Sequence, residues 1–217
     1  MAGQEPKRGR FITFEGIDGC GKSTQIQILA SALAAEGHEV ICLREPGGTE
    51  LSEEIRHLLL NEDSHAIADR AELLLFLAAR SQLVSERILP ALEAGQIVLS
   101  DRFYDSTMAY QGYGRGLDLD YLRDLNDFAC HGLKPDLTLL LEVSELALKR
   151  RIERREAEER NRFDNAQAAF LERVRKGFMA LASAEPRRIQ IVSTEGSKSA
   201  TAAQIYELVR DSLKTDS

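Results

Sequence analysis

Short runs of apolar residues alternate along this chain with longer stretches in which apolar residues recur every three or four positions. Most of the short runs are continuous rather than alternating, which is typical of parallel strands buried on both faces. We expect five strands, at Phe11–Phe14, Val40–Leu43, Ile97–Leu99, Leu137–Val143 and Ile189–Val192. Strands that alternate with helices predict an α/β fold of three layers, with one open parallel sheet and right-handed crossovers.

Helical periodicity marks the stretches between these strands. We expect helices near Ser23–Glu36, Glu50–Leu60, Asp69–Leu92, Asp120–His131, Glu145–Glu159, Ala166–Ala184 and Thr201–Leu213. Gly37 and Gly95 stand where a glycine commonly ends a helix before the next strand. The 217 residues show no repeat and no low-complexity linker, so we expect one domain over residues 1–217. In such sheets ligands bind beyond the carboxyl ends of the strands, and we expect the functional motifs there.

Composition and charge exclude several classes of protein. Hydrophobic residues make up 43% of the chain and charged residues 29%, which is ordinary for a globular protein. Lys and Arg number 28 against 35 Asp and Glu, so the net charge is −7 and we expect no general attraction to nucleic acid. No apolar run approaches the roughly 20 residues of a membrane span, and the charged first residues lack the apolar core of a signal peptide. We therefore expect no membrane partner and a cytoplasmic location.

Cysteine and histidine give no sign of a metal centre. Cys20, Cys42 and Cys130 are odd in number and widely spaced, which favours reduced thiols over a disulfide framework. They also lack the spacing of metal ligands. The four histidines form no H-E-x-x-H motif or similar cluster, so we interpret them as surface or packing residues.

A glycine-rich segment directly follows the first expected strand. Residues 16–23 read GIDGCGKS, which has the G-x-x-x-x-G-K-[ST] spacing of a phosphate-binding loop. The glycines let the backbone turn its N–H groups toward a phosphate, Lys22 reaches the outer phosphates, and Ser23 is placed to hold Mg²⁺. A chance match in a glycine-rich loop is the alternative, but the flanking strand and amphipathic helix favour a phosphate loop.

We therefore expect this segment to bind a nucleoside triphosphate. The binding residues would be Gly16, Ile17, Asp18, Gly19, Cys20, Gly21, Lys22, Ser23 and Thr24. Cys20 lies beside a helix N-terminus, an environment that lowers the pKa of a thiol. We also expect bound ATP to shield this cysteine from thiol reagents.

Two further segments follow the second and third expected strands. Arg44 opens the loop REPGGT, where it could meet a second anion, although a plain loop before a helix is the alternative. Asp101 stands at the tip of a buried strand beside the phosphate loop, so we expect it to help hold Mg²⁺ with Ser23. The next residue, Arg102, could hold a second phosphate by bidentate hydrogen bonds. The alternative for Arg102 is a structural salt bridge at the strand end.

A Phe and an Arg share one face of the third expected helix, because Phe76 and Arg80 are four residues apart. A helical Phe is commonly a core residue. Paired with an arginine on an otherwise apolar face, it also suits a base stacked on the ring, with the guanidinium reading the edge of that base.

The stretch Lys149–Arg162 carries many charges of both signs. A solvated helix with ion pairs four residues apart is the default interpretation. Its net charge is nevertheless positive in an acidic chain, and it follows the fourth strand, so it could fold over the triphosphate. The candidates for stabilising the transferred phosphoryl group are Arg150, Arg154, Arg160 and Arg162.

The chain resembles the bacterial type of the thymidylate kinase family in five segments, which are FEGIDGCGKST, REPGGT, FLAAR, DRFYDSTMAYQGYGRG and PDLTLLLEV. The match runs by motif from about Phe11 to Arg162. The resemblance implies a P-loop NTPase-type fold with a helical lid at about 149–162. It implies the reaction ATP + dTMP ⇌ ADP + dTDP with Mg²⁺, in dTTP biosynthesis, and usually a homodimer.

The resemblance also implies roles at the acceptor phosphate. Asp18 would lie by the sugar and the acceptor phosphate, which Arg44 and Arg102 would approach. The bacterial subtype rests on Gly19, where the eukaryotic form carries an arginine, and on the arginines of the lid. The residues implied in catalysis are Lys22, Asp18, Arg102, Arg150, Arg154 and Arg160.

At the nucleoside, the resemblance implies contacts with both base and sugar. Pro46 would form a wall of the base pocket, Phe76 would stack on thymine, and Arg80 would bond its edge. Tyr110 would crowd the 2′ position and favour deoxyribose. The residues implied as further base contacts are Ser106 and Gln111.

Two other classes of protein share a phosphate loop. A GTPase-type switch would need an Asn-Lys-x-Asp guanine reader, and the nearest string, LKTD at 213–216, lacks the Asn. A kinase for another nucleotide or for a nucleoside is the nearer alternative. A nucleoside kinase would need a carboxylate base near the acceptor hydroxyl and no arginine for an acceptor phosphate.

Overall fold

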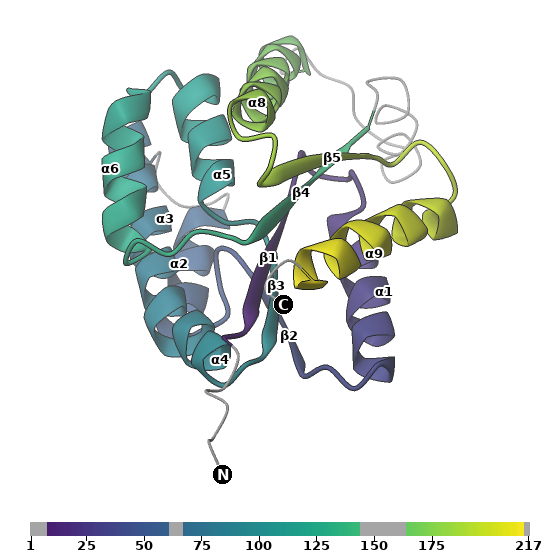
Figure 1. Cartoon of the computed structure of the whole chain (residues 1–217). Helices are drawn as coiled ribbons and strands as arrows, with labels where there is room; N and C mark the ends of the chain where they lie inside the picture. Colours follow the sequence, from purple (N-terminus) through teal and green to yellow (C-terminus); the bar gives the residue numbers. More distant parts are fainter. Residues whose placement is uncertain (1–7, 61–66, 144–163, 215–217) are drawn as a thin grey trace.

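A five-stranded parallel sheet forms the centre of the computed structural model, which describes residues 8–60, 67–143 and 164–214 (Figure 1). The strands are β1 (Arg10–Glu15), β2 (Val40–Arg44), β3 (Ile97–Asp101), β4 (Leu137–Glu142) and β5 (Ile189–Ser193). Their order in the sheet is β2-β3-β1-β4-β5, and every neighbouring pair is parallel. The predicted five-stranded parallel sheet is confirmed.

Helices connect the strands. They are α1 (Lys22–Ala35), α2 (Glu50–Leu60), α3 (Asp69–Leu83), η1 (Val84–Ile88), α4 (Leu89–Glu93), α5 (Tyr104–Thr107), η2 (Met108–Gly114), α6 (Leu119–Ala129), α8 (Asp164–Ala184) and α9 (Lys198–Lys214). The stretch expected as one helix from Asp69 to Leu92 consists of α3, the π-helical turns of η1, and α4. The helix expected at Glu145–Glu159 lies outside the described residues.

The helical segment formed by α5 and η2 was not expected from the sequence. Two glycines in η2, Gly112 and Gly114, lower its intrinsic helix propensity. Tertiary contacts override that propensity, because η2 packs against α8. A side chain at position 114 would meet Phe170 of α8 at 2.7 Å, so the close approach requires a glycine there.

The sheet is covered on both faces, which explains the apolar runs in its strands. Alternate residues of β1 point to opposite sides, so Ile12 and Phe14 pack with α1, α8 and α9 while Phe11 packs with η1 and α4. Figure 1 shows α1 and α9 on one side of the sheet and α2 to α6 on the other. The predicted arrangement of three layers is confirmed.

The carboxyl ends of all five strands lie at one edge of the sheet. Arg44 at the end of β2 lies opposite Asp101 at the end of β3, and Phe14 of β1 lies opposite Asp101 on its other side. The chain runs first to the β3 side of β1 and only later to the β4 side. Such a switch in direction opens a crevice beside β1, at the carboxyl ends of the strands.

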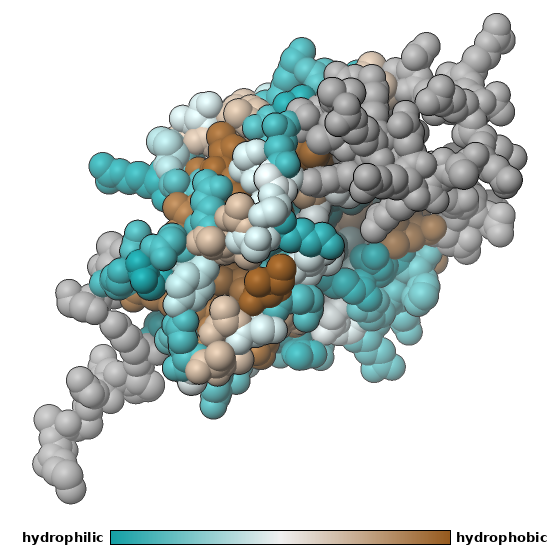
Figure 2. Space-filling model, turned by 90° about the vertical axis from the view of Figure 1, so that its right-hand side faces the viewer, coloured by the Kyte–Doolittle hydropathy of each residue, from teal (hydrophilic) through white to brown (hydrophobic). Residues whose placement is uncertain are grey.

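Figure 2 shows the side of the molecule that carries α1 and α9, where apolar patches lie among polar side chains. Ile28 of α1 and Ile191 of β5 are partly exposed, at 39% and 40%. Within residues 8–60, 67–143 and 164–214, none of the helices has the length and apolar character that crossing a membrane requires.

Candidate functional site

A cavity of about 700 Å³ lies at the carboxyl edge of the sheet. It brings together most of the predicted site residues, namely Asp18, Gly19, Gly21, Lys22, Ser23, Thr24, Arg44, Pro46, Phe76, Arg80, Asp101, Arg102, Ser106, Tyr110 and Gln111. Gly16, Ile17 and Cys20 belong to the same loop but are not among the residues that line the cavity. One continuous cavity therefore joins the glycine-rich loop to the helix face that carries Phe76.

The glycine-rich loop turns directly from β1 into α1. Gly21, at the N-terminus of α1, has φ +109°, a conformation that side chains other than glycine rarely adopt. A Cβ at Gly16 would lie 2.5 Å from the carbonyl oxygen of Leu141 in β4. Both glycines are therefore required by the backbone path. This path places the first N–H groups of α1 at the cavity, where an anion can bind.

The ammonium group of Lys22 lies inside this loop. Its Nζ donates to the carbonyl oxygens of Gly16 at 3.1 Å and Ile17 at 3.2 Å, and it lies 3.8 Å from Sγ of Cys20. The Lys22 side chain is buried, yet the residue lines the cavity. The loop thus wraps around a positive charge that faces the space a phosphate would take.

The expectation of an activated thiol at Cys20 is wrong. Cys20 is fully buried, and burial raises the pKa of its thiol although Lys22 opposes the shift. The thiol lies on the inner side of the loop, where it would contact a side chain at Gly16. The nearby helix N-terminus cannot offset the loss of water around a thiolate.

The two predicted metal ligands lie in contact. The hydroxyl of Ser23 donates to Oδ2 of Asp101 at 2.8 Å, at the point where α1 begins and β3 ends. Within the described part of the chain, no group of three or more His, Cys, Asp or Glu could hold a metal. One hydroxyl and one carboxylate suit Mg²⁺, which takes few protein oxygens and completes its shell with phosphate oxygens and water.

Arg102 lines the cavity and has a strained backbone. Its φ is +75°, which is uncommon for a residue with a side chain and is frequent at functional sites. Its backbone N–H donates to Phe14 at 2.9 Å, and its carbonyl accepts from the hydroxyl of Ser100 at 2.8 Å. These two bonds hold the strained conformation at the end of β3.

The guanidinium of Arg102 is held by three side chains that also line the cavity. It donates to Asp18 at 2.8 Å, to the hydroxyl of Ser106 at 2.8 Å and to the hydroxyl of Tyr110 at 3.3 Å. It also lies 5.0 Å from the centre of the Tyr110 ring. Partial desolvation works against ionisation of Asp18, but Arg102 and then Lys22 lower its pKa. The cavity therefore presents a fixed cation beside a carboxylate.

A buried carboxylate, Glu15, shares the hydroxyl of Ser106 with Arg102. At the end of β1, its oxygens accept from the backbone N–H of Phe103 at 2.8 Å and from the hydroxyl of Ser106 at 2.6 Å. Because that hydroxyl donates to Glu15, its lone pairs face the guanidinium of Arg102. Glu15 is not among the residues predicted from the sequence, although a carboxylate at the end of an apolar strand was a visible signal.

The pKa of Glu15 is raised to about 7 from its usual value of 4.5. Burial is the main cause and the neighbouring Asp105 adds to it, while Arg102, Ser106 and the Phe103 N–H act in the opposite direction. The folded protein therefore keeps a proton on Glu15 at pH values where the unfolded chain has released it.

We expect this group to lower the free energy of unfolding as the pH rises from about 4.5 to 7. In this window the folded state binds more protons than the unfolded state, so each rise in pH favours unfolding. The variant Glu15→Gln lacks this titration, and its stability should fall less over the same window. Urea unfolding at matched pH values measures both slopes. Parallel slopes would show that Glu15 titrates near its usual value.

The loop after β2 places Arg44 at the cavity, but in an ion pair. Its guanidinium contacts both carboxylate oxygens of Glu53, at 3.0 and 2.8 Å, and donates to the carbonyl of Pro46 at 3.1 Å. The Glu45–Pro46 peptide bond is cis. The side chain of Arg44 is 47% exposed, so an anion in the cavity would compete with Glu53 for it.

Arg80 of α3 lines the cavity, and its guanidinium belongs to a buried polar network. Its Nε and Nη2 contact one oxygen of Glu45 at 2.8 and 2.7 Å, and its Nη1 donates to Thr107 at 2.9 Å and Asn126 at 2.8 Å. Most of its donors are therefore used inside the protein, which leaves less of the guanidinium for a ligand than the sequence suggested. Phe76, one turn earlier, lines the same cavity.

Four residues line the cavity that the sequence analysis did not single out, namely Glu45, Arg56, Leu60 and Thr107. Glu45 and Thr107 are chain neighbours of predicted residues, so their motifs held a signal. Arg56 donates to the carbonyl of Pro46 at 2.9 Å from α2, and nothing in its spacing connects it with the phosphate loop. The lid arginines Arg150, Arg154, Arg160 and Arg162 lie outside the described residues.

Comparisons with known proteins all point to one family. The family model for thymidylate kinases matches residues 14–205. A thymidylate kinase from Desulfovibrio desulfuricans is 54% identical over 187 residues, which cover 84% of this chain and 86% of that protein. A thymidylate kinase from Geobacter sulfurreducens is 44% identical over 93% of this chain and 96% of its own length.

A solved structure extends the comparison to the fold. The crystal structure of a thymidylate kinase from Ehrlichia chaffeensis superimposes with a TM-score of 0.77 at 33% sequence identity. The match covers 93% of this chain and 99% of that one. The sheet and its flanking helices therefore have a counterpart in a solved structure.

Proposed function

This chain belongs to the thymidylate kinase family and is an enzyme that phosphorylates dTMP, and from this premise we propose that its cavity holds ATP and dTMP end to end. The reaction is ATP + dTMP ⇌ ADP + dTDP, in dTTP biosynthesis. One observation carries the proposal: Lys22, Arg102 and Phe76 line one cavity, and Arg102 bonds Asp18 of the glycine-rich loop. A cation in that position suits the meeting point of two phosphate groups.

In the donor half, the phosphate loop would hold ATP. The N–H groups at the start of α1 and the ammonium of Lys22 would contact the phosphates. The hydroxyl of Ser23 and the carboxylate of Asp101 would hold Mg²⁺, which neutralises charge on the phosphates when bound. Residues Gly16–Thr24 shape this half through the backbone conformations described above.

In the acceptor half, Arg102 would bind the phosphate of dTMP. Its guanidinium already points into the cavity, because Ser106 and Tyr110 orient it. Asp18 would lie at the same phosphate and sugar, and Arg44 would contribute once it exchanges Glu53 for the phosphate. These charged residues line the same cavity as the phosphate loop, which supports this assignment.

The nucleoside would lie toward α3 and η2. Phe76 would stack on thymine, Arg80 would bond its edge with the donor left by its internal network, and Pro46 would close one wall. Tyr110 would face the sugar, where its ring leaves no partner for a 2′-hydroxyl. The remaining base contacts would come from Ser106 and Gln111.

Phosphoryl transfer would proceed by positioning and charge neutralisation. The acceptor phosphate is already ionised near neutral pH, so no general base is needed. Lys22 and Arg102 would hold the two reacting groups in line. Of the residues outside the described ranges, we propose Arg150, Arg154 and Arg160 for the charge on the transferred group, a role worth roughly 10³–10⁵ in rate.

A coupled assay of ADP release across the nucleoside monophosphates tests the proposal. We expect the highest kcat/KM with dTMP. We also expect a strong preference over the ribose counterpart, because its 2′-hydroxyl would meet Tyr110 without a hydrogen-bond partner. Turnover of a different nucleotide, or of a nucleoside, in place of dTMP would overturn the acceptor assignment.

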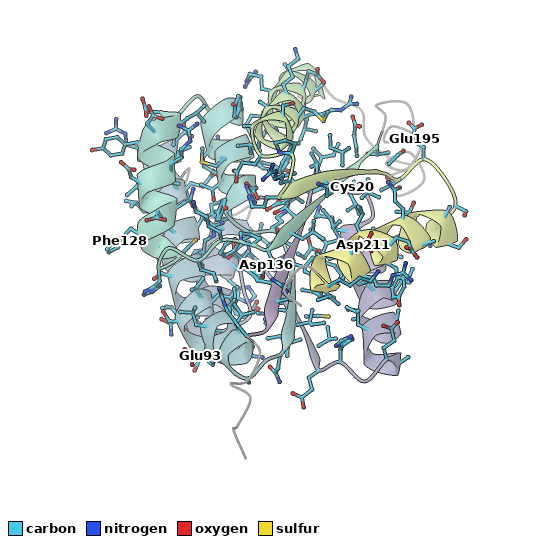
Figure 3. All side chains as sticks on the ribbon, viewed as in Figure 1. Cys20, Glu93, Phe128, Asp136, Glu195 and Asp211 are labelled. Atoms are coloured by element: carbon cyan, nitrogen blue, oxygen red, sulfur yellow. The ribbon has the colours of Figure 1, made fainter. Side chains whose placement is uncertain are left out.

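We further propose that the enzyme works as a homodimer, through the outer surface of α2, α3 and α6. These three helices pack side by side on one side of the sheet (Figure 1). Their large exposed apolar side chains outside the cavity lining are Leu51, Leu58, Leu74, Tyr121 and Phe128. Phe128, on the outer side of α6, is 84% exposed (Figure 3). Apolar side chains gathered on one face favour contact with a partner of the same kind.

The variant Phe128→Glu should run as a monomer in light scattering, whereas the native enzyme should have twice the mass of the chain. A charge buried without a partner at the interface would prevent association. The fold should persist, since the side chain is almost fully exposed within one chain. Ile28→Glu, on α1 at the opposite side of the sheet, is the matched control and should remain dimeric. A dimeric Phe128→Glu would place the interface elsewhere.

The location of the enzyme is also a proposal. We propose the cytoplasm, because Cys20, Cys42 and Cys130 are free thiols and a reducing compartment preserves free thiols. Cell fractionation with an antibody to the protein would test it. Recovery from an oxidising compartment would contradict it.

A further inference from the structure

One face of α3 carries three residues at intervals of four positions, Glu72, Phe76 and Arg80. Phe76 and Arg80 line the cavity. Glu72, one turn before Phe76, has a side chain that is 17% exposed. It is the member of this row that the proposed mechanism does not use.

Glu72 accepts hydrogen bonds from two residues of the segment around η2. Its Oε1 accepts from Nε2 of Gln111 at 2.9 Å and from Nε of Arg115 at 2.9 Å, and its Oε2 accepts from Nη2 of Arg115 at 2.6 Å. A second carboxylate, Asp69, holds Arg115 at 3.1 Å. The Glu72 carboxylate is therefore fixed between an arginine and an amide.

This contact decides which end of the Gln111 amide faces the cavity. An amide has one end that donates and one that accepts, and an arginine-paired carboxylate offers only acceptors. The NH₂ group of Gln111 must therefore turn toward Glu72, so its carbonyl oxygen Oε1 turns away. Among residues 8–60, 67–143 and 164–214 no side chain donates to that oxygen, and Gln111 lines the cavity.

We propose that Glu72 is a positioning residue for substrate selection, because it holds Gln111 so that the base pocket offers an acceptor to position N3 of a pyrimidine. The proposal rests on the proposed function, in which the base lies between Phe76 and Gln111. Arg80, from the same helix face, has one N–H of Nη2 beyond its bonds to Glu45, Thr107 and Asn126, and in this proposal that N–H donates to the neighbouring O4. Together the two side chains form a pattern of one acceptor beside one donor.

That pattern matches thymine and uracil and opposes cytosine. Thymine and uracil carry a hydrogen on N3 and an oxygen at C4, so both positions find a complementary group. Cytosine carries an unprotonated acceptor at N3 and an amino donor at C4. Two acceptors would therefore face each other at N3, and two donors would face each other at C4. A buried polar group without a partner loses its hydrogen bond to water and gains none in return. The methyl group at C5 does not enter this pattern.

The experiment compares dTMP, dUMP and dCMP in the native enzyme and in Glu72→Gln. The amide introduced at position 72 can donate to Oε1 of Gln111. The Gln111 amide is then no longer held with its NH₂ group toward position 72. We expect the kcat/KM ratio of dTMP to dCMP to fall on the order of tenfold. The ratio of dTMP to dUMP should stay unchanged, because both bases carry the N3 hydrogen. Where dCMP turnover is too slow to measure, its inhibition constant against dTMP replaces kcat/KM.

Asp69→Asn is the matched control, since it removes the other acidic partner of Arg115 and leaves Gln111 in place. It should keep the native dTMP to dCMP ratio. Gln111→Met, which removes the amide altogether, should lower the ratio as Glu72→Gln does, and it serves if the latter fails to fold. An unchanged ratio in folded variants that still use dTMP would overturn the role of Glu72. Absence of dTMP activity in the native enzyme would instead overturn the proposed function.

Discussion

Replacing Lys22 with alanine should lower kcat by roughly 10²–10³-fold, the effect of removing one preorganised donor from a developing charge. The ammonium of Lys22 is buried in the loop and faces the cavity where the phosphates of ATP would lie. No other side chain of the glycine-rich loop carries a positive charge. The loss should therefore appear in turnover more than in affinity for dTMP.

The fold should survive this change, because Lys22 contacts only its own loop. Circular dichroism and thermal unfolding check the fold, and the coupled assay measures the rate. Lys176→Ala, which removes an exposed lysine of α8, controls for the loss of one positive charge. Near-native turnover in a folded Lys22→Ala protein would remove the assignment of GIDGCGKS as the phosphate loop.

Arg102→Ala should abolish the use of dTMP while ATP still binds. We expect kcat/KM for dTMP to fall on the order of 10²–10³-fold, as for the loss of one partner of a desolvated, charge-assisted contact. In the donor half Arg102 bonds the carboxylate of Asp18, whereas the loop N–H groups and Lys22 would hold ATP, so we expect ATP binding to persist. Titration with a fluorescent ATP analogue and steady-state kinetics in dTMP measure the two halves separately.

Arg102→Lys is the informative companion variant. It keeps the charge but loses the planar fork, so its activity should lie between native and alanine. Arg44→Ala should have a smaller effect, because Arg44 is shared with Glu53 at the rim of the cavity. If Arg102→Ala lost ATP affinity and kept its KM for dTMP, the two halves of the cavity would have to be exchanged.

Local patterns in the sequence predicted the sheet and marked the glycine-rich loop, for physical reasons. Buried parallel strands are recognisable because covered faces demand continuous apolar runs such as Leu137–Val143. The loop at Gly16–Ser23 is recognisable because few residue types allow its backbone path. Where structure depends on short-range preferences of this kind, neighbours in the chain carry the information.

Features that depend on partners distant in the chain could not be predicted. The segment η2 is helical because α8 packs against it, despite its glycines. Cys20 stands beside a helix N-terminus as expected, but its thiol faces inward, so burial decides its pKa. The orientation of Gln111 depends on Glu72, 39 positions earlier. Periodicity shows which residues share a face, but not which polar group from another element meets them.

The carbonyl bonds of Lys22 have a consequence for the end of the catalytic cycle. Gly16 and Ile17 accept from its ammonium inside the loop. A phosphate that takes up this ammonium would exchange one set of hydrogen bonds for another, so we expect the net gain to be small. We also expect the same two carbonyls to take the ammonium back when ADP leaves, which would lower the barrier to dissociation. We expect a fast ADP off-rate in stopped-flow displacement, and a slow one would show that the loop has no such internal competitor.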